Sequence, residues 1–172
     1  VHVLDFFREN NTVYMVMNYE DGKDLRWYIK RHNGRMTEKF IRTVFPPLLD
    51  GLRELHRNNL LHLDIKPANV FLTSRGPKIL DFGLAKSVMA AAVGSMQPTR
   101  SAEAMLTDPG STVGTVAYMS PEQLRGEERD RRSDLFSIGL VLYEMATGCP
   151  AFTGATSAVI SSAILHDTPK PP

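Results

Sequence analysis

The sequence lacks the features that mark several large classes of protein. Only one of its 172 residues is a cysteine, Cys149, so neither a disulfide framework nor a thiolate zinc cluster can form within it. It has no run of about eighteen apolar residues and no charged-then-apolar leader, which excludes a membrane span and a signal peptide in this stretch. Its 20 basic and 19 acidic side chains provide no strong field for nucleic acid or an acidic membrane, so a partner must be recognised locally.

The sequence does contain enough apolar material for one folded unit. A length of 172 residues and a hydrophobic content of 42% allow one real core and are too small for two large ones. The single cysteine favours a reducing compartment. We therefore expect this part of the protein to be cytoplasmic, with any membrane anchor elsewhere in a longer chain. Because the chain opens at Val1 in a strand-like pattern, we expect it to be a piece of such a longer protein.

Local patterns predict a mixed α+β structure. The expected strands are Val3 to Phe7 and Val13 to Met17 as a hairpin, then Val70 to Thr73 and Lys78 to Leu80 around a turn at 74–77. The expected helices begin at Asp24 and near Thr37, the second running toward His56, with two more over Asp134 to Thr147 and Ser157 to His166.

Several segments should interrupt or organise these elements. Asp21-Gly22 should break the chain after the hairpin, and Pro46-Pro47 predict a kink or a split in the second helix, because proline lacks an amide donor and clashes with the preceding turn. Residues 87–113 show no periodicity and predict a mobile loop. The helix from Asp134 is apolar nearly all round and ends before Gly148, so it should be the hub of the core.

One motif carries most of the chemical information. His62-Leu63-Asp64-Ile65-Lys66-Pro67-Ala68-Asn69 is followed by Asp81-Phe82-Gly83. Transfer of a phosphoryl group needs a carboxylate to accept the proton of the attacking hydroxyl, oxygen ligands for Mg²⁺, and a cation near the moving phosphate. Asp64 is the candidate base, Asn69 and Asp81 are the candidate Mg²⁺ ligands, and Lys66 is the candidate cation.

This motif resembles the catalytic and metal-binding loops of protein kinases, whose signature is H-R-D-x-x-x-x-N followed by D-F-G. The segment 114–122 resembles the family's A-P-E region, and Asp134 resembles the buried Asp that braces the catalytic loop. The resemblance implies a protein-kinase-like fold with a partial small lobe of two strands and a mainly helical large lobe. Lys66-Pro67 is the form seen in serine/threonine kinases, and Thr115 stands where the family hydrogen-bonds toward the loop's Asp and Lys.

The resemblance also implies a layout and a set of ligands. Residues 1–20 would be the end of the small lobe and the hinge, 21–172 the large lobe, and about 84–119 a mobile activation segment. ATP and Mg²⁺ would be the cofactors, a protein with a Ser or Thr acceptor the partner, and a bacterium the source. His62 would pack with Phe82 and take no proton itself.

Further residues would bind the nucleotide by the same resemblance. They are Met17 as gatekeeper, Asn18 and Glu20 through their backbone at the hinge, Asp24 at the ribose, Phe71 under the adenine, and Asp81 through the metal. Each has a plainer interpretation. Taken alone, Met17 and Phe71 are typical core residues, and Asp24 is equally suited to a helix N-terminus.

Three departures from the family pattern limit the interpretation. The sequence has no glycine-rich phosphate turn, no strand Lys and no partner Glu upstream, so we expect this chain alone to be a poor enzyme. Leu63 replaces the Arg that pairs with an activation-segment phosphate, which predicts activity independent of that switch. Glu122 would be left half-satisfied, because the family pairs it with an Arg beyond residue 172.

Two other functions stay open at this point. A pseudokinase or regulatory scaffold would keep the fold without transferring phosphate, but it has no need of Asp64, Lys66, Asn69 and Asp81 together. A small-molecule phosphotransferase of the antibiotic-modifying sort shares the base and the metal, but Lys66-Pro67 and Ser120-Pro121-Glu122 speak against it.

Overall fold

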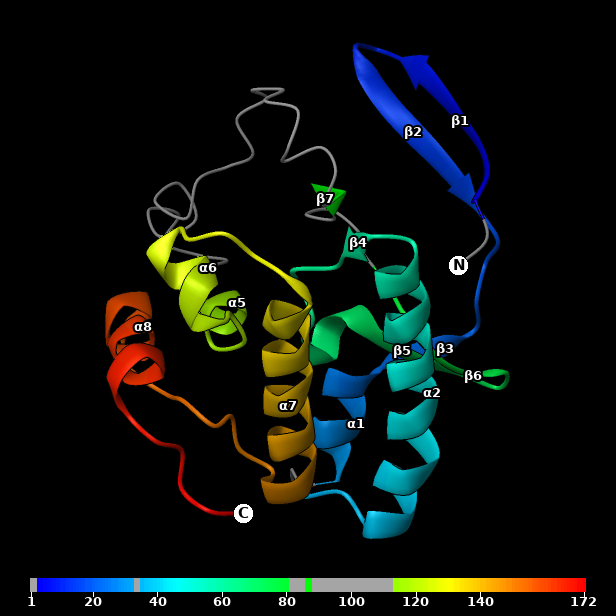
Figure 1. Ribbon diagram of the computed structural model, residues 1–172. Helices are drawn as coiled ribbons and strands as arrows, with labels where there is room; N and C mark the ends of the chain where they lie inside the picture. The colour runs from blue at the N-terminus through cyan, green and yellow to red at the C-terminus, as the bar shows by residue number, and fades with distance from the viewer. Residues whose placement is uncertain (1–2, 33–34, 81–85, 88–112) are drawn as a thin grey trace.

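The computed structural model describes residues 3–32, 35–80, 86–87 and 113–172. In chain order the elements are β1 (Val3–Glu9), β2 (Thr12–Met17), β3 (Gly22–Asp24), α1 (Leu25–Arg31), α2 (Glu38–Arg57), β4 (Leu60–Leu61), the 3₁₀ turn η1 (Pro67–Asn69), β5 (Val70–Thr73), β6 (Gly76–Ile79), β7 (Lys86–Ser87), α5 (Val113–Val116), α6 (Pro121–Arg125), α7 (Arg131–Thr147) and α8 (Ser157–His166). The α+β class is confirmed, and Figure 1 shows α7 between α2 on one side and α5, α6 and α8 on the other.

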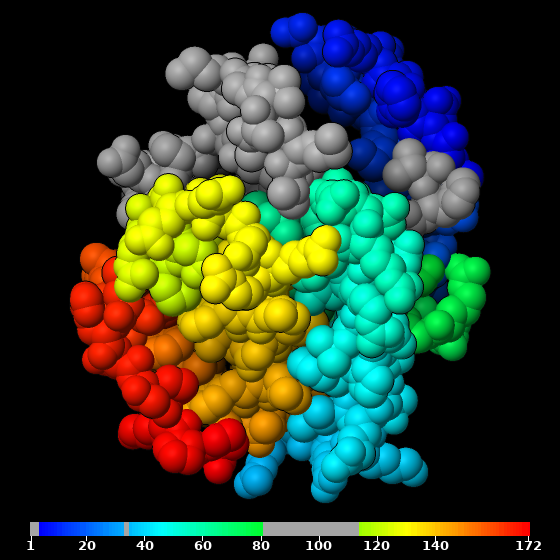
Figure 2. All heavy atoms as spheres, viewed as in Figure 1, coloured from blue at the N-terminus to red at the C-terminus, as the bar shows by residue number. Residues whose placement is uncertain are grey.

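Strands β1 and β2 form the predicted antiparallel hairpin, with Phe7 opposite Tyr14 and their rings stacked at a centroid distance of 5.2 Å. The hairpin projects beyond the packed helices, as Figure 2 shows in blue. Its apolar side chains are consequently exposed, Phe6 to 72% and Met17 to 50%. Met17 is therefore not a core residue in this structure, and its gatekeeper role stays a prediction.

Helix α2 begins where the sequence predicts, because Thr37 Oγ1 accepts a hydrogen bond from Phe40 N at 3.2 Å. The predicted split at Pro46-Pro47 is wrong, since α2 is a single helix from Glu38 to Arg57. Both prolines lie on the exposed face of the helix. The carbonyls that lose their amide donors therefore face water, while the opposite face of the helix stays packed in the core.

Helix α7 separates two groups of buried side chains and is the hub that the sequence predicts. It begins at Arg131, after the N-cap Asp130 and three residues earlier than the predicted start at Asp134. It ends at the C-cap Gly148, whose φ of 82° is the left-handed conformation typical of a helix C-terminus. One core cluster comprises Leu25, Ile29, Met36, Val44, Leu48, Leu52, Ile65, Val70, Leu72, Ile138, Val141 and Met145. The other comprises Val116, Ala117, Met119, Leu140, Phe152, Ile160 and Ile164.

The burial of α7 is less complete than its sequence predicts. Leu135, in its first turns, is 52% exposed. Two small polar residues, Ser133 and Ser137, are buried instead. Ser137 Oγ donates to Tyr118 O at 2.7 Å, so these positions join α7 to the segment before α6 by hydrogen bonds. The prediction from apolar periodicity is therefore correct for the helix as a whole and wrong for Leu135.

A three-stranded sheet in the order β3–β5–β6 lies beside α1 and α2, and its first strand is unexpected from the sequence. Where Asp21-Gly22 predicts only a break, Gly22 begins β3 and pairs with Thr73. A Cβ at Gly22 would lie 2.2 Å from the backbone oxygen of Leu72, so only glycine fits there.

Two further expectations concern the rest of the chain. The predicted mobile loop at 87–113 lies almost wholly outside the described residues. Within the residues that are described, no helix is both long and apolar enough to span a membrane.

Candidate functional site

The loop that carries Asp64 is anchored from below by Asp134 of α7. Asp134 is fully buried, and its carboxylate accepts three hydrogen bonds: from His62 N at 2.9 Å, from Leu63 N at 2.8 Å and from His56 Nε2 at 2.8 Å. A buried carboxylate is stable only when donors surround it in this way. The predicted brace is confirmed in its geometry, and the sequence reasoning missed that His56 of α2 takes part in it.

His62 is fully buried at the start of the same loop. Its Nε2 lies 3.0 Å from Leu80 O, and its Nδ1 accepts from Asp64 N at 3.3 Å. A neutral imidazole protonated on Nε2 satisfies both contacts. This arrangement supports a structural role for His62. Its expected partner Phe82 lies outside the described residues.

Four of the predicted catalytic side chains converge on one cluster. Lys66 Nζ donates to both oxygens of Asp64, at 3.0 and 2.8 Å, and to Thr115 Oγ1 at 3.2 Å. Asn69 Nδ2 donates to Asp64 Oδ2 and to the Asp64 backbone oxygen, both at 2.8 Å. The side chains of Asp64 and Lys66 are 16% and 20% exposed, so the cluster is largely shielded yet open at its surface.

The cluster can contribute one Mg²⁺ ligand. Because Asn69 uses its amide nitrogen for both bonds to Asp64, its side-chain oxygen has no donor among the described residues. A neutral amide oxygen is a hard donor that suits Mg²⁺. The second predicted ligand, Asp81, lies outside the described residues, but Leu80 N just before it donates to Asn69 O at 2.8 Å. Within the described part of the chain, no three His, Cys, Asp or Glu side chains form a metal-binding group.

The predicted nucleotide residues lie around β2, β3 and β5. Asp24 and Phe71 are register partners of β3 and β5. Asp24 Oδ1 accepts from Trp27 N at 2.7 Å and so caps α1. The plainer interpretation of Asp24 is therefore correct, and its contact with ribose stays a prediction. Phe71 is half-buried.

Glu20 has a structural role that the sequence reasoning missed. Its side chain is only 9% exposed and forms ion pairs with Lys78 and, at 2.9 Å, with Arg75, both from the β5–β6 hairpin. The hydrogen bond from Lys78, followed by that from Arg75, holds the pKa of the Glu20 carboxyl below its ordinary value. The ion pairs tie the segment after β2 to the β5–β6 hairpin. They do not test whether the Glu20 backbone binds a purine.

Glu122 at the head of α6 is not left without a donor. Ser133 Oγ of α7 donates a hydrogen bond to its carboxylate. Burial alone would raise the pKa of this carboxyl, but that hydrogen bond and those from nearby backbone hold it below its ordinary value. Ser133 thus supplies a donor that the local sequence around Glu122 does not predict.

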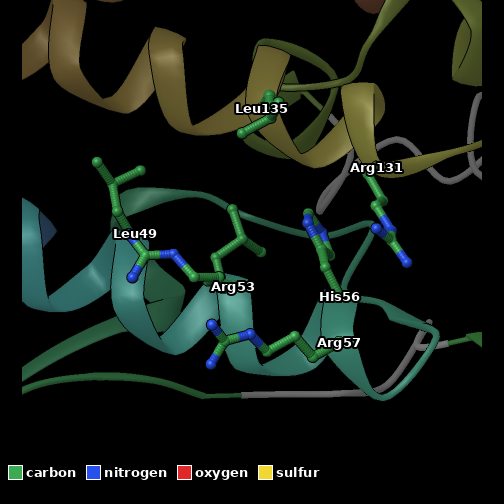
Figure 3. Close-up of a pocket in the computed structure, with 7 residues that line it drawn as sticks. Leu49, Arg53, His56, Arg57, Arg131 and Leu135 are labelled. Atoms are coloured by element: carbon green, nitrogen blue, oxygen red, sulfur yellow. The ribbon is translucent and has the colours of Figure 1, made fainter.

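The surface of the described residues has two hollows, and Asp64 lines neither of them. One, of about 350 Å³, lies between α2 and α7, and Figure 3 shows Leu49, Arg53 and Arg57 reaching it from α2 and Leu135 from α7. The other, of about 420 Å³, is lined by Asn18 and Glu20 together with residues of α2 and β6.

Comparison with known proteins identifies the family of the chain. The family model described as "Protein kinase domain" matches residues 1–170, so the chain belongs to the protein kinase family. It is 39% identical over 160 residues to a probable serine/threonine-protein kinase PknB of Bifidobacterium longum, covering 92% of this chain and 21% of that protein. It is 37% identical over 160 residues to serine/threonine-protein kinase PknB of Mycobacterium tuberculosis, covering 92% and 24%.

A probable serine/threonine-protein kinase of Streptomyces coelicolor is 36% identical over 171 residues, covering 98% of this chain and 23% of that protein. The chain thus spans about a fifth to a quarter of the length of these curated relatives.

Proposed function

We propose that this chain is part of a serine/threonine protein kinase that transfers the γ-phosphoryl group of ATP to Ser and Thr hydroxyls of other proteins. The observation that carries the proposal is the position of Lys66, which contacts the candidate base Asp64 and Thr115 at once. A protein hydroxyl entering this cluster would meet a carboxylate, a cation and an amide already held together. Most of the rate acceleration would come from this positioning and from electrostatics.

The roles of the residues follow from the chemistry of the step. The acceptor oxygen forms a bond to the γ-phosphorus, the bond from that phosphorus to the ADP oxygen breaks, and the hydroxyl proton passes to the Asp64 carboxylate. Lys66 neutralises charge on the transferred group, and Thr115 holds Lys66 and Asp64 in register. Asn69, with Asp81, would hold Mg²⁺, which neutralises the phosphate charge when bound.

The remaining assignments are part of the same proposal. Met17, Asn18, Glu20, Asp24 and Phe71 would surround the nucleotide. Residues 1–20 would be the hinge end of the small lobe, 21–172 the large lobe, and about 84–119 the activation segment. The bacterial sources and the names of the relatives support a bacterial serine/threonine kinase. We place this part of the protein in the cytoplasm.

The position of Leu63 supports activity without an activation-segment phosphate. Its side chain is 5% exposed and apolar, so it cannot pair with a phosphate as an arginine would. In the full-length protein, alanine and phosphomimetic changes at the Ser and Thr residues of 87–112 should therefore leave the transfer rate nearly unchanged. A change of orders of magnitude would overturn this part of the proposal.

A transfer assay with γ-labelled ATP tests the proposed function. The full-length protein should label a general protein acceptor, and acid hydrolysis of that acceptor should release phosphoserine or phosphothreonine. Transfer to an aminoglycoside in place of protein would assign a small-molecule phosphotransferase. No transfer to either acceptor, with ATP and Mg²⁺ present, would instead favour a regulatory scaffold.

A further inference from the structure

Leu63, the residue before Asp64, has an unusual backbone. Its φ is 63°, the left-handed conformation, although it carries a branched apolar side chain that is 5% exposed. Residues of this kind rarely adopt that conformation, and it persists only where the surrounding structure holds it in place. Something must therefore fix the two peptide groups of Leu63, and these groups set where the Asp64 carboxylate points.

Two helices hold these groups, one on each side. Leu63 N donates to Asp134 Oδ1 of α7 at 2.8 Å, and Leu63 O accepts from Gln123 Nε2 of α6 at 2.8 Å. Gln123 is 7% exposed, so its bond to the loop lies away from bulk water. If that donor is lost, the Leu63 carbonyl is left buried without a partner, and the strained residue is free to relax.

The amide of Gln123 is used at both of its ends. Its oxygen accepts from Ser120 N at 3.0 Å, while Ser120 Oγ accepts from Gln123 N at 3.4 Å, which completes a capping box at the start of α6. A glutamate can serve such a box equally well. It has no hydrogen to donate to Leu63 O, however, so the link between α6 and the loop requires the amide.

We propose that Gln123 is a positioning residue for phosphoryl transfer, whose amide ties α6 to the loop that carries Asp64. The proposal rests on the proposed function and adds a cause for the geometry of the base. The bond joins an uncharged amide to a backbone carbonyl, so it needs neither a phosphate nor a change of charge. The bond thus couples the loop that carries Asp64 to the segment after residue 112 without phosphorylation. In kinases with an arginine at the position of Leu63, that arginine makes such a link through a phosphate.

Gln123→Glu separates this role from the helix cap, because the carboxylate keeps the acceptor for Ser120 N and loses the donor for Leu63 O. Ser120→Ala is the matched control, because it removes the hydroxyl of the cap and leaves the amide donor in place. In the full-length protein we expect Gln123→Glu to lower kcat about tenfold to a hundredfold with little change in KM for ATP, since a small displacement of a catalytic group costs this much. Ser120→Ala should leave kcat close to that of the wild type.

Hydrogen–deuterium exchange of the amides of residues 62–66 provides a second readout that does not depend on activity. Gln123→Glu should speed their exchange, and Gln123→Met, which removes the amide without adding charge, should do the same even if the glutamate variant folds poorly. Unchanged exchange in both variants, or an equal loss of kcat in Ser120→Ala, would overturn the proposal. A wild-type protein that transfers no phosphate would refute the proposed function. The exchange data would still show whether Gln123 holds the loop at residues 62–66 in place.

Discussion

The buried carboxylate of Asp134 is the most sharply defined support of the site, and Asp134→Asn should expose its contribution. Asparagine keeps the shape of the side chain but replaces one acceptor oxygen with a donor. Either orientation of the amide turns a donor toward at least one of the three donors that now reach Asp134. One buried N–H loses its acceptor, and the other bonds weaken because they are no longer charge-assisted.

These losses add up to a cost of about 2–4 kcal/mol in the free energy of unfolding, after allowing for the smaller desolvation of an amide. Such a cost is a large share of the free energy of unfolding of a typical domain, which is roughly 5–15 kcal/mol. Urea denaturation followed by circular dichroism measures it. The catalytic rate should fall as well, because the peptide groups on either side of His62 lose their anchor.

Asp130→Asn is the matched control, because it makes the same chemical change four residues earlier on the same helix. Asp130 is the N-cap of α7 and its side chain is 52% exposed. Asparagine and aspartate are equivalent N-caps, so this variant should unfold nearly as the wild type does. A cost below about 1 kcal/mol for Asp134→Asn, or equal costs for the two variants, would refute the reasoning.

Two further predictions concern stability. Gly22→Ala should lower the free energy of unfolding by about 1–3 kcal/mol, because its Cβ would lie 2.2 Å from Leu72 O. In the same denaturation assay, the control Gly51→Ala in α2 should raise it by up to about 1 kcal/mol, because the Cβ there meets nothing within 4 Å. Equal effects would contradict the structure of β3. Burial raises the pKa of the Glu144 carboxyl, although hydrogen bonding by Tyr118 opposes this. The folded state therefore binds more protons than the unfolded state, and the free energy of unfolding falls as pH rises from the ordinary glutamate pKa to the raised one. Glu144→Gln should therefore gain stability relative to wild type as pH rises through that window, and a constant difference would exclude this linkage.

Local sequence patterns predicted the parts of the fold that short-range chemistry decides. The hairpin, the Thr37 cap of α2 and the stop at Gly148 all depend on residues within a few positions of one another. Strand β3 was not predictable in this way. It is three residues long, and it exists because residues 22–24 pair with residues 71–73 far along the chain.

The same distinction applies to the site. The motif around Asp64 predicted the cluster with Lys66 and Asn69, because the family's spacing already encodes it. The roles of Glu20 and Gln123 depend on partners 55 to 60 residues away, for which the sequence has no local signal. Only the Ser-x-x-Gln pattern at the start of α6 could have pointed to Gln123, and that pattern accounts for the cap alone.

Asp64 is the proposed base, and the rate of phosphoryl transfer in Asp64→Asn tests this role most directly. Asparagine can still accept a hydrogen bond from Lys66, but it cannot take a proton from the acceptor hydroxyl. With saturating ATP and Mg²⁺, the full-length variant should transfer phosphate about 10²–10⁴-fold more slowly than wild type, whereas Asp50→Asn, an exposed control on α2, should match wild type. A rate for Asp64→Asn within about tenfold of wild type would contradict the assignment of the base.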